Sequence, residues 1–199
     1  MSRRPLAPRP VCWMALGSTV LDLGCGDGTL LRYLEQTRNT TGYGIEIDDA
    51  SILACVKNGV NVVQSDLERG LSGFEDGSFD YVVLSQTIQA MKNSEIIVRE
   101  MLRVGREGIV TFPNFGYWKN RLEVLRGRMP ISENLPYEWF NTPNVRLCTV
   151  ADFERFCSER GIRIVERKVL TRGRPVNLAP NLLGALAVYH FGTGRPITP

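Results

Sequence analysis

The residues with the clearest chemical meaning are three alternate glycines, Gly24, Gly26 and Gly28, which follow the apolar run Thr19–Leu23. A turn built on glycine lets the backbone approach a ligand closely and adopt positive φ angles. The apolar run is typical of a buried parallel strand, and the leucines from Leu30 to Leu34 recur at helical spacing. Strand, turn and helix in this order direct free backbone N–H groups towards a ligand above the turn.

The spacing of the glycines bears on which ligand this is. A dinucleotide fingerprint reads G-x-G-x-x-G/A, whereas here Thr29 stands at the third glycine position. Asp22 and Asp27 flank the turn, and their carboxylates would repel a pyrophosphate but suit a cationic ammonium or sulfonium group. Cys25 could be a reactive thiol, although a small side chain filling the turn is the favoured interpretation. A glycine turn that binds nothing is the remaining alternative.

Acidic residues follow the next two predicted strands. Glu46 lies near the end of the strand predicted over 42–48, 22 residues after Gly24, and an acid at about this separation accepts hydrogen bonds from a ribose diol. Asp66 follows the strand predicted from Val62, where it could reach an adenine amino group. A solvated turn residue is the alternative for either acid alone, but their repetition behind a glycine turn favours a nucleoside site.

These motifs, together with the predicted strand Phe79–Ser85, resemble those of class I S-adenosylmethionine-dependent methyltransferases. More selective motifs resemble the methionine-biosynthesis protein MetW family over roughly residues 18–172. They lie at residues 84–91, 112–116, 127–130, 135–144 and 147–149.

The resemblance implies S-adenosyl-L-methionine or S-adenosyl-L-homocysteine as cofactor. It implies a binding site made of Asp22, Gly24, Cys25, Gly26, Gly28, Glu46, Ile47, Asp66, Leu67, Ser85 and Gln86. Members of the MetW family are partners of the homoserine O-acyltransferase of methionine biosynthesis, which implies an accessory or regulatory role. The alternatives are an active methyltransferase on a small-molecule or protein acceptor and a nucleotide-binding oxidoreductase.

No catalytic residue can be assigned from the sequence. Tyr117 and Tyr137 could contact an acceptor, and Gln86 and Gln89 follow the fourth strand, where methyltransferases often bind the acceptor or the cofactor. His190 lies in the last predicted strand and is interpreted as structural.

Strands alternating with helices predict an α/β fold, a doubly wound, mostly parallel, seven-stranded Rossmann-like methyltransferase sheet with an antiparallel last strand. We expect one domain over residues 1–199, with a poorly structured segment over 1–17 because three prolines interrupt it. Helices are predicted after Asp48, with Ile52, Leu53 and Val56 inward, over 93–104 and over 150–160. The later strands are predicted over 108–112, 162–170 and 182–191.

The segment 113–148 is longer than a crossover between neighbouring strands requires. It is rich in aromatic residues, and Leu122 to Leu125 predict a short helix that ends at Gly127. The segment could pack an edge of the sheet, cover an acceptor pocket as a lid, or dock another protein. Its aromatic residues are Phe115, Tyr117, Trp118, Tyr137, Trp139 and Phe140.

Composition narrows the remaining classes of function. A hydrophobic content of 43% and a net charge of +3 are ordinary for a globular protein and argue against nucleic acid as a partner. No apolar run reaches the roughly 18 residues of a membrane span. Five cysteines without a C-x-x-C pair, and a single histidine, indicate neither zinc nor a disulfide framework, so we expect a cytoplasmic protein.

Overall fold

The computed structural model describes residues 13–192 and confirms the expected α/β class, with an eight-stranded sheet in the order β3-β2-β1-β4-β5-β8-β6-β7. β1 pairs in parallel with β2 and β4, β2 pairs in parallel with β3, and β6 pairs antiparallel with β7 and β8. One more strand is present than predicted, the two-residue β7. The strands are β1 (Thr19–Leu23), β2 (Thr41–Glu46), β3 (Val62–Gln64), β4 (Phe79–Ser85), β5 (Gly105–Pro113), β6 (Arg163–Thr171), β7 (Arg174–Pro175) and β8 (Leu186–Gly192).

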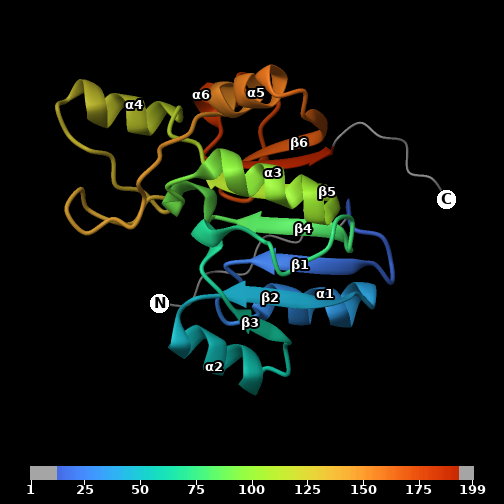
Figure 1. The fold of residues 1–199 in the computed structure, drawn as a ribbon. Helices are drawn as coiled ribbons and strands as arrows, with labels where there is room; N and C mark the ends of the chain where they lie inside the picture. The colour runs from blue at the N-terminus through green and yellow to red at the C-terminus, as the bar shows by residue number, and fades with distance from the viewer. Residues whose placement is uncertain (1–12, 193–199) are drawn as a thin grey trace. The chain divides into compact units, whose positions relative to one another are not determined.

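Helices separate most of the strands, as Figure 1 shows. The last predicted strand began too early, because Pro180 opens the short helix α6 and β8 therefore starts at Leu186. None of the described helices is both long and apolar enough to cross a membrane. The helices are α1 (Thr29–Arg38), α2 (Asp49–Lys57), α3 (Ser94–Val104), α4 (Trp118–Leu125), α5 (Val150–Glu159) and α6 (Pro180–Leu183), with 3₁₀ turns η2 (Leu67–Arg69) and η3 (Ile88–Ala90).

The chain forms two compact units. The first contains the described residues up to Ser85 together with Asn93–Ile109, and the second contains Gln86–Lys92 and the described residues from Val110 onward. The expectation of a single domain stays a prediction. The expected disorder of the N-terminal segment falls largely on residues 1–12, which lie outside the described part.

In the first unit, side chains alternate between the two faces of the sheet. Val20 and Val83 pack with Leu31 and Leu34 of α1 in one buried cluster, whereas Val82, on the opposite face, lies beside Gly105 at the end of α3. Successive side chains of a strand point to opposite faces, and here both faces are buried, as is usual in a parallel sheet. β1 is therefore fixed in the middle of the unit, and the turn that follows it has a rigid base.

The predicted orientation of α2 is wrong. Leu53 and Val56 are 54% and 62% exposed, and Ile52 is only partly buried, whereas Cys55 is fully buried. The face of α2 that carries Cys55 lies inward, because Cys55 fills the space beneath the glycine turn. A Cβ added at Gly28 would lie 3.1 Å from the Cys55 sulfur. The fit to the turn thus outweighs the apolar spacing of the helix.

The second unit has an aromatic core. Phe153 of α5 packs its ring against Tyr189 and Phe191 of β8, and Phe112 of β5 stacks on Tyr189. β8 pairs with β6 in antiparallel register from Leu170↔Leu186 to Arg163↔Gly192. The aromatic core and the antiparallel pair together hold the ends of β5 and β6, from which the loops of this unit extend.

Candidate functional site

The glycine turn after β1 uses glycine for its backbone conformation. Gly24, Gly26 and Gly28 have φ angles of 70°, 58° and 76°, in the left-handed region that other residues rarely adopt. A Cβ at Gly28 would lie 3.0 Å from the Val60 side chain, whereas one at Gly26 would meet no atom within 4 Å. The lower part of the turn is therefore closely packed, and the space beside Gly26 is open to a ligand.

Glu46 reaches this turn from the end of β2. The Gly26 N–H donates to Glu46 Oε2 at 2.8 Å, and the N–H groups of Ile47 and Asp48 donate to Oε1 at 2.9 and 3.2 Å. The parallel register Leu23↔Ile45 brings the two strand ends together, and Gly24 N donates to the Ile45 carbonyl. The acid and the loop, distant in sequence, therefore form one hydrogen-bonded unit.

Cys25 lies inside this unit beside a second cysteine. Its sulfur is 3.7 Å from that of Cys55, and the Cys55 thiol donates to the Gly26 carbonyl at 3.1 Å. Burial, followed by the charge of Asp22, raises the pKa of the Cys25 thiol far above its usual range. The thiol is therefore neutral, which favours packing over reactivity.

Sequence reasoning did not single out Gly44 and Cys55 as parts of this site. A Cβ at Gly44 would lie 2.3 Å from the Cys25 sulfur, so only glycine lets β2 pass this close to the turn. The sequence did contain a signal for Gly44, because a glycine within a predicted strand often marks the close approach of another segment. Cys55 had no comparable signal, because it lies in the middle of a helix.

The other expected residues of the first unit lie at neighbouring strand ends. Asp22 is buried in β1 in register with Gly44, and Ile47 is exposed just after β2. Asp66 follows β3, where its Oδ1 accepts from the Glu68 N–H at 3.0 Å and caps η2, whose first residue is Leu67. Because β3, β2, β1 and β4 are consecutive in the sheet, these residues and Ser85 lie along one edge of the unit.

Gln86 and Gln89 belong to the second unit. Gln86 is exposed with a φ of 49°, and its carbonyl accepts from the Gln89 side-chain amide at 2.8 Å. The Gln89 carbonyl accepts from the N–H groups of Val145 and Arg146. Gln89 thus anchors the end of the long crossover.

His190, interpreted from the sequence as structural, is buried in β8, and this position suits a structural role.

Asn114, in the motif at 112–116, joins three segments of the second unit. This fully buried side chain donates to the carbonyls of Asn181 and Gly184 at 3.0 and 2.7 Å. Its oxygen accepts from the N–H groups of Gly116 and Val150 at 3.0 and 3.2 Å. One amide therefore joins the end of β5 to the first residue of α5, to α6 and to the residue that follows α6, which is a structural role.

The aromatic side chains of the crossover are largely exposed. Trp139 and Phe140 are 75% and 65% exposed, and Trp118 and Tyr137 are each 42% exposed. Leu125 and Ile131, in the same segment, are also exposed. These exposed side chains are available for contacts outside the unit, whereas Leu135 of the same segment is buried; the expected lid or docking surface stays a proposal.

The order of the strands and the glycine turn after β1 define the Rossmann-like fold of class I S-adenosylmethionine-dependent methyltransferases. Solved structures with this fold include an S-adenosylmethionine-dependent methyltransferase from Thermotoga maritima, with a TM-score of 0.66 and 18% identity over 92% of this chain and 85% of that one. Another, from Mesorhizobium loti, has a TM-score of 0.67 and 15% identity over 93% and 97%. At these identities the likeness shows the fold alone.

The family is narrower than the fold. The model of the family "Methionine biosynthesis protein MetW" matches residues 10–191, so the chain belongs to the MetW family. A bifunctional methionine biosynthesis protein MetXA/MetW from Rhodopirellula baltica is 40% identical over 160 residues, or 75% of this chain. The match spans only 26% of that relative.

The same fold also carries other chemistry. The [4+2]-cyclase SpnF matches with a TM-score of 0.65 and 16% identity over 94% of this chain and 78% of that structure. Fold likeness therefore does not assign methyl transfer to this chain.

Proposed function

We propose that the chain binds S-adenosylmethionine or S-adenosylhomocysteine and acts as an accessory or regulatory partner of a homoserine O-acyltransferase. The observation that carries the proposal is the relative from Rhodopirellula baltica, in which MetXA and MetW are named as parts of one protein. Activities that are fused in one chain in one organism often act as a complex elsewhere. The chain would then supply a regulatory cofactor site to the acyltransferase.

The residues of the first unit fit such a cofactor. The open side of Gly26 leaves space for the amino-acid part of the cofactor, beside the acidic residues that suit its cationic groups. Glu46 is held at the turn, where its carboxylate would accept a hydrogen bond from the ribose, and Asp66 would lie near the adenine. The expected contributions of Ile47, Leu67, Ser85 and Gln86 remain part of this proposal.

The second candidate is an active methyltransferase, which the fold of the neighbouring structures favours. Methyl transfer can proceed by orientation and exclusion of water without a general base. Transfer of the labelled methyl group from the cofactor to an acceptor in a cell extract would support this candidate. Tight cofactor binding without any turnover would favour the accessory role, and a cytoplasmic location is predicted for either.

The proposed docking surface consists of the exposed aromatic residues of the crossover, Trp118, Tyr137, Trp139 and Phe140. Tryptophan and tyrosine are enriched among the residues that dominate binding energy at protein interfaces. The Trp139 and Phe140 rings contact each other edge to face at 5.8 Å. This pair would therefore present a preformed apolar surface to the acyltransferase.

Affinity measurements with the acyltransferase from the same cell test this role. We expect the double variant Trp118→Ala/Trp139→Ala to bind at least about tenfold more weakly, since truncating one dominant aromatic costs about 2 kcal/mol or more. Its melting temperature and cofactor affinity should stay normal. Tyr33→Ala, which removes an exposed aromatic from α1 of the first unit, is the matched control and should bind normally. Full partner binding by the double variant would remove the proposed surface.

A further inference from the structure

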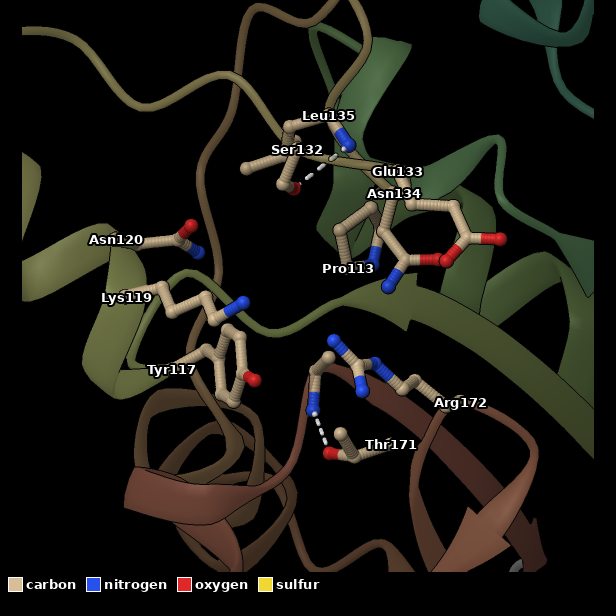
Figure 2. A pocket seen from close by; sticks show the side chains of 11 residues that line it. Pro113, Tyr117, Lys119, Asn120, Ser132, Glu133, Asn134, Leu135, Thr171 and Arg172 are labelled. Carbon is tan, nitrogen blue, oxygen red and sulfur yellow. Dashed lines mark hydrogen bonds between the residues drawn. The ribbon is translucent and has the colours of Figure 1, made fainter.

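A small cavity opens in the second unit (Figure 2), and none of its lining residues is among those proposed to bind the cofactor or the acyltransferase. It lies between the start of α4, the loop at 132–135 and the turn after β6, and has a volume of about 140 Å³. This is well below the roughly 300 Å³ at which pockets for drug-sized ligands begin. The cavity therefore suits a ligand of few heavy atoms.

Two cationic side chains line this cavity. Lys119 from α4 and Arg172 from the β6–β7 turn extend their nitrogen atoms towards each other across it, as Figure 2 shows. Within residues 13–192 neither side chain forms an ion pair, whereas Arg99, Arg103 and Arg126 each pair with a carboxylate. The ammonium of Lys119 lies 5.7 Å from the centre of the Trp118 ring. Like charges that face each other in a cavity are stabilised when an anion lies between them.

The backbone at Arg172 adopts a conformation that is unfavourable for arginine. Thr171 pairs with Arg174, so Arg172 and Gly173 form a two-residue hairpin loop, with φ angles of 49° and 74°. Such loops favour Asn-Gly or Asp-Gly because both central residues need positive φ. Arginine is a poor choice for this backbone. Unfavourable residues at such positions often mark functional sites.

The other polar groups of the cavity complete a site for an anion. The Tyr117 hydroxyl and the Asn134 amide also line it, and both can donate hydrogen bonds. Glu133 lines the cavity as well, so the lining has two cationic groups against one acidic group. This balance favours a ligand that carries negative charge.

We propose that this cavity binds a small free carboxylate, held by Arg172 and Lys119. A guanidinium matches a carboxylate with two parallel hydrogen bonds, and an ammonium adds a second charge without a fixed direction. A mono- or dicarboxylate of a few carbon atoms fits both the volume and the charge. The residues that line the cavity differ from the proposed cofactor and docking residues, and the proposal does not depend on either of those sites.

Succinate serves as the probe, with calorimetry and melting temperature measured on the whole chain at constant ionic strength. We expect succinate to bind the wild type and raise its melting temperature. Arg172→Asn should weaken binding at least tenfold, because hydrogen bonds between two charged groups are lost. Without ligand this variant should melt at the same or a higher temperature, since Asn-Gly suits the hairpin loop. Lys119→Gln should weaken binding without unfolding the first turn of α4, because Lys119 is itself exposed.

Arg174→Gln is the matched control, because this exposed arginine lies in the same hairpin but does not line the cavity. It should bind succinate as the wild type does. Equal succinate affinity in Arg172→Asn and the wild type would overturn the proposal. Tighter binding of inorganic phosphate than of succinate would also overturn it, because the site would then not be one for carboxylates.

Discussion

Glu46 shows how one side chain can serve both the fold and a ligand. Its carboxylate accepts three backbone hydrogen bonds, from Gly26, Ile47 and Asp48. An ionised carboxylate offers about four acceptor positions, so room remains for one hydroxyl donor. The three existing bonds fix the acid beside Gly26, and a ribose would therefore meet a carboxylate that needs no rearrangement.

We expect Glu46→Ala to bind S-adenosylmethionine at least about tenfold more weakly, since one hydrogen bond to a charged group contributes about 1.5–3 kcal/mol. Calorimetry measures this effect. The melting temperature shows how much of it comes from loosening the turn. Glu35→Ala, on the exposed face of α1, is the control and should bind normally. Equal affinity in Glu46→Ala and the wild type, or tighter binding of NAD than of S-adenosylmethionine, would contradict the cofactor assignment.

At the scale of elements, the second unit depends on how β5 ends. The Asn114 side chain bonds to the chain at Asn181 and Gly184, around α6, and at Val150, the first residue of α5. The backbone carbonyl of Asn114 accepts from the buried Asn120 side-chain amide of α4 at 3.2 Å. Residues of three helices therefore bond to the residue that follows β5. Without the Asn114 side chain, the Val150 N–H and the carbonyls of Asn181 and Gly184 would lose this partner.

Replacing this amide should destabilise the second unit strongly. Asn114→Ala leaves two carbonyls and two N–H groups without their partner, and each buried unsatisfied group costs about 1–3 kcal/mol. We expect a total loss of at least about 3 kcal/mol, or a fall in melting temperature of roughly 6–12 °C. Asn144→Ala, at a half-buried position of the crossover where the backbone N–H donates the hydrogen bond, should change little. A fall below about 2 °C for Asn114→Ala would show that water replaces these bonds readily.

At the scale of the whole molecule, both units keep buried thiols neutral. Burial raises the pKa of Cys148 and of Cys157 to about 12 in the second unit, and burial also raises the pKa of Cys55 in the first. The ordinary value is 9.0. Above that value the unfolded chain loses these protons first, so the folded state is favoured below pH 9 and loses stability as the pH rises towards 12.

We therefore expect the free energy of unfolding, measured by urea denaturation, to fall between pH 8 and pH 10. Cys157→Ala should be less stable at both values because it leaves a cavity, but its loss between them should be smaller by roughly 1 kcal/mol. Cys148 lies in a half-buried position and should contribute in the same direction. An identical fall in Cys157→Ala and the wild type would show that this thiol does not titrate on unfolding.

Local patterns in the sequence were sufficient for the order of strands and helices and for the place of the glycine turn. The three alternate glycines predicted positive φ angles because backbone conformation depends on the residue itself. The α/β alternation predicted a mostly parallel sheet with an antiparallel end, because short connections and buried apolar runs leave few arrangements. The family resemblance also rested on contiguous motifs, which the sequence displays directly.

Tertiary packing decided the features that depend on distant neighbours. The orientation of α2 follows from Cys55 fitting beneath the turn rather than from the spacing of Ile52, Leu53 and Val56. The fold brings remote segments together, so that Asn114 bonds to Gly184 and Lys119 and Arg172 line the same cavity. Exposure of the crossover aromatics is likewise a property of packing, since the same apolar residues could have formed a core in another arrangement.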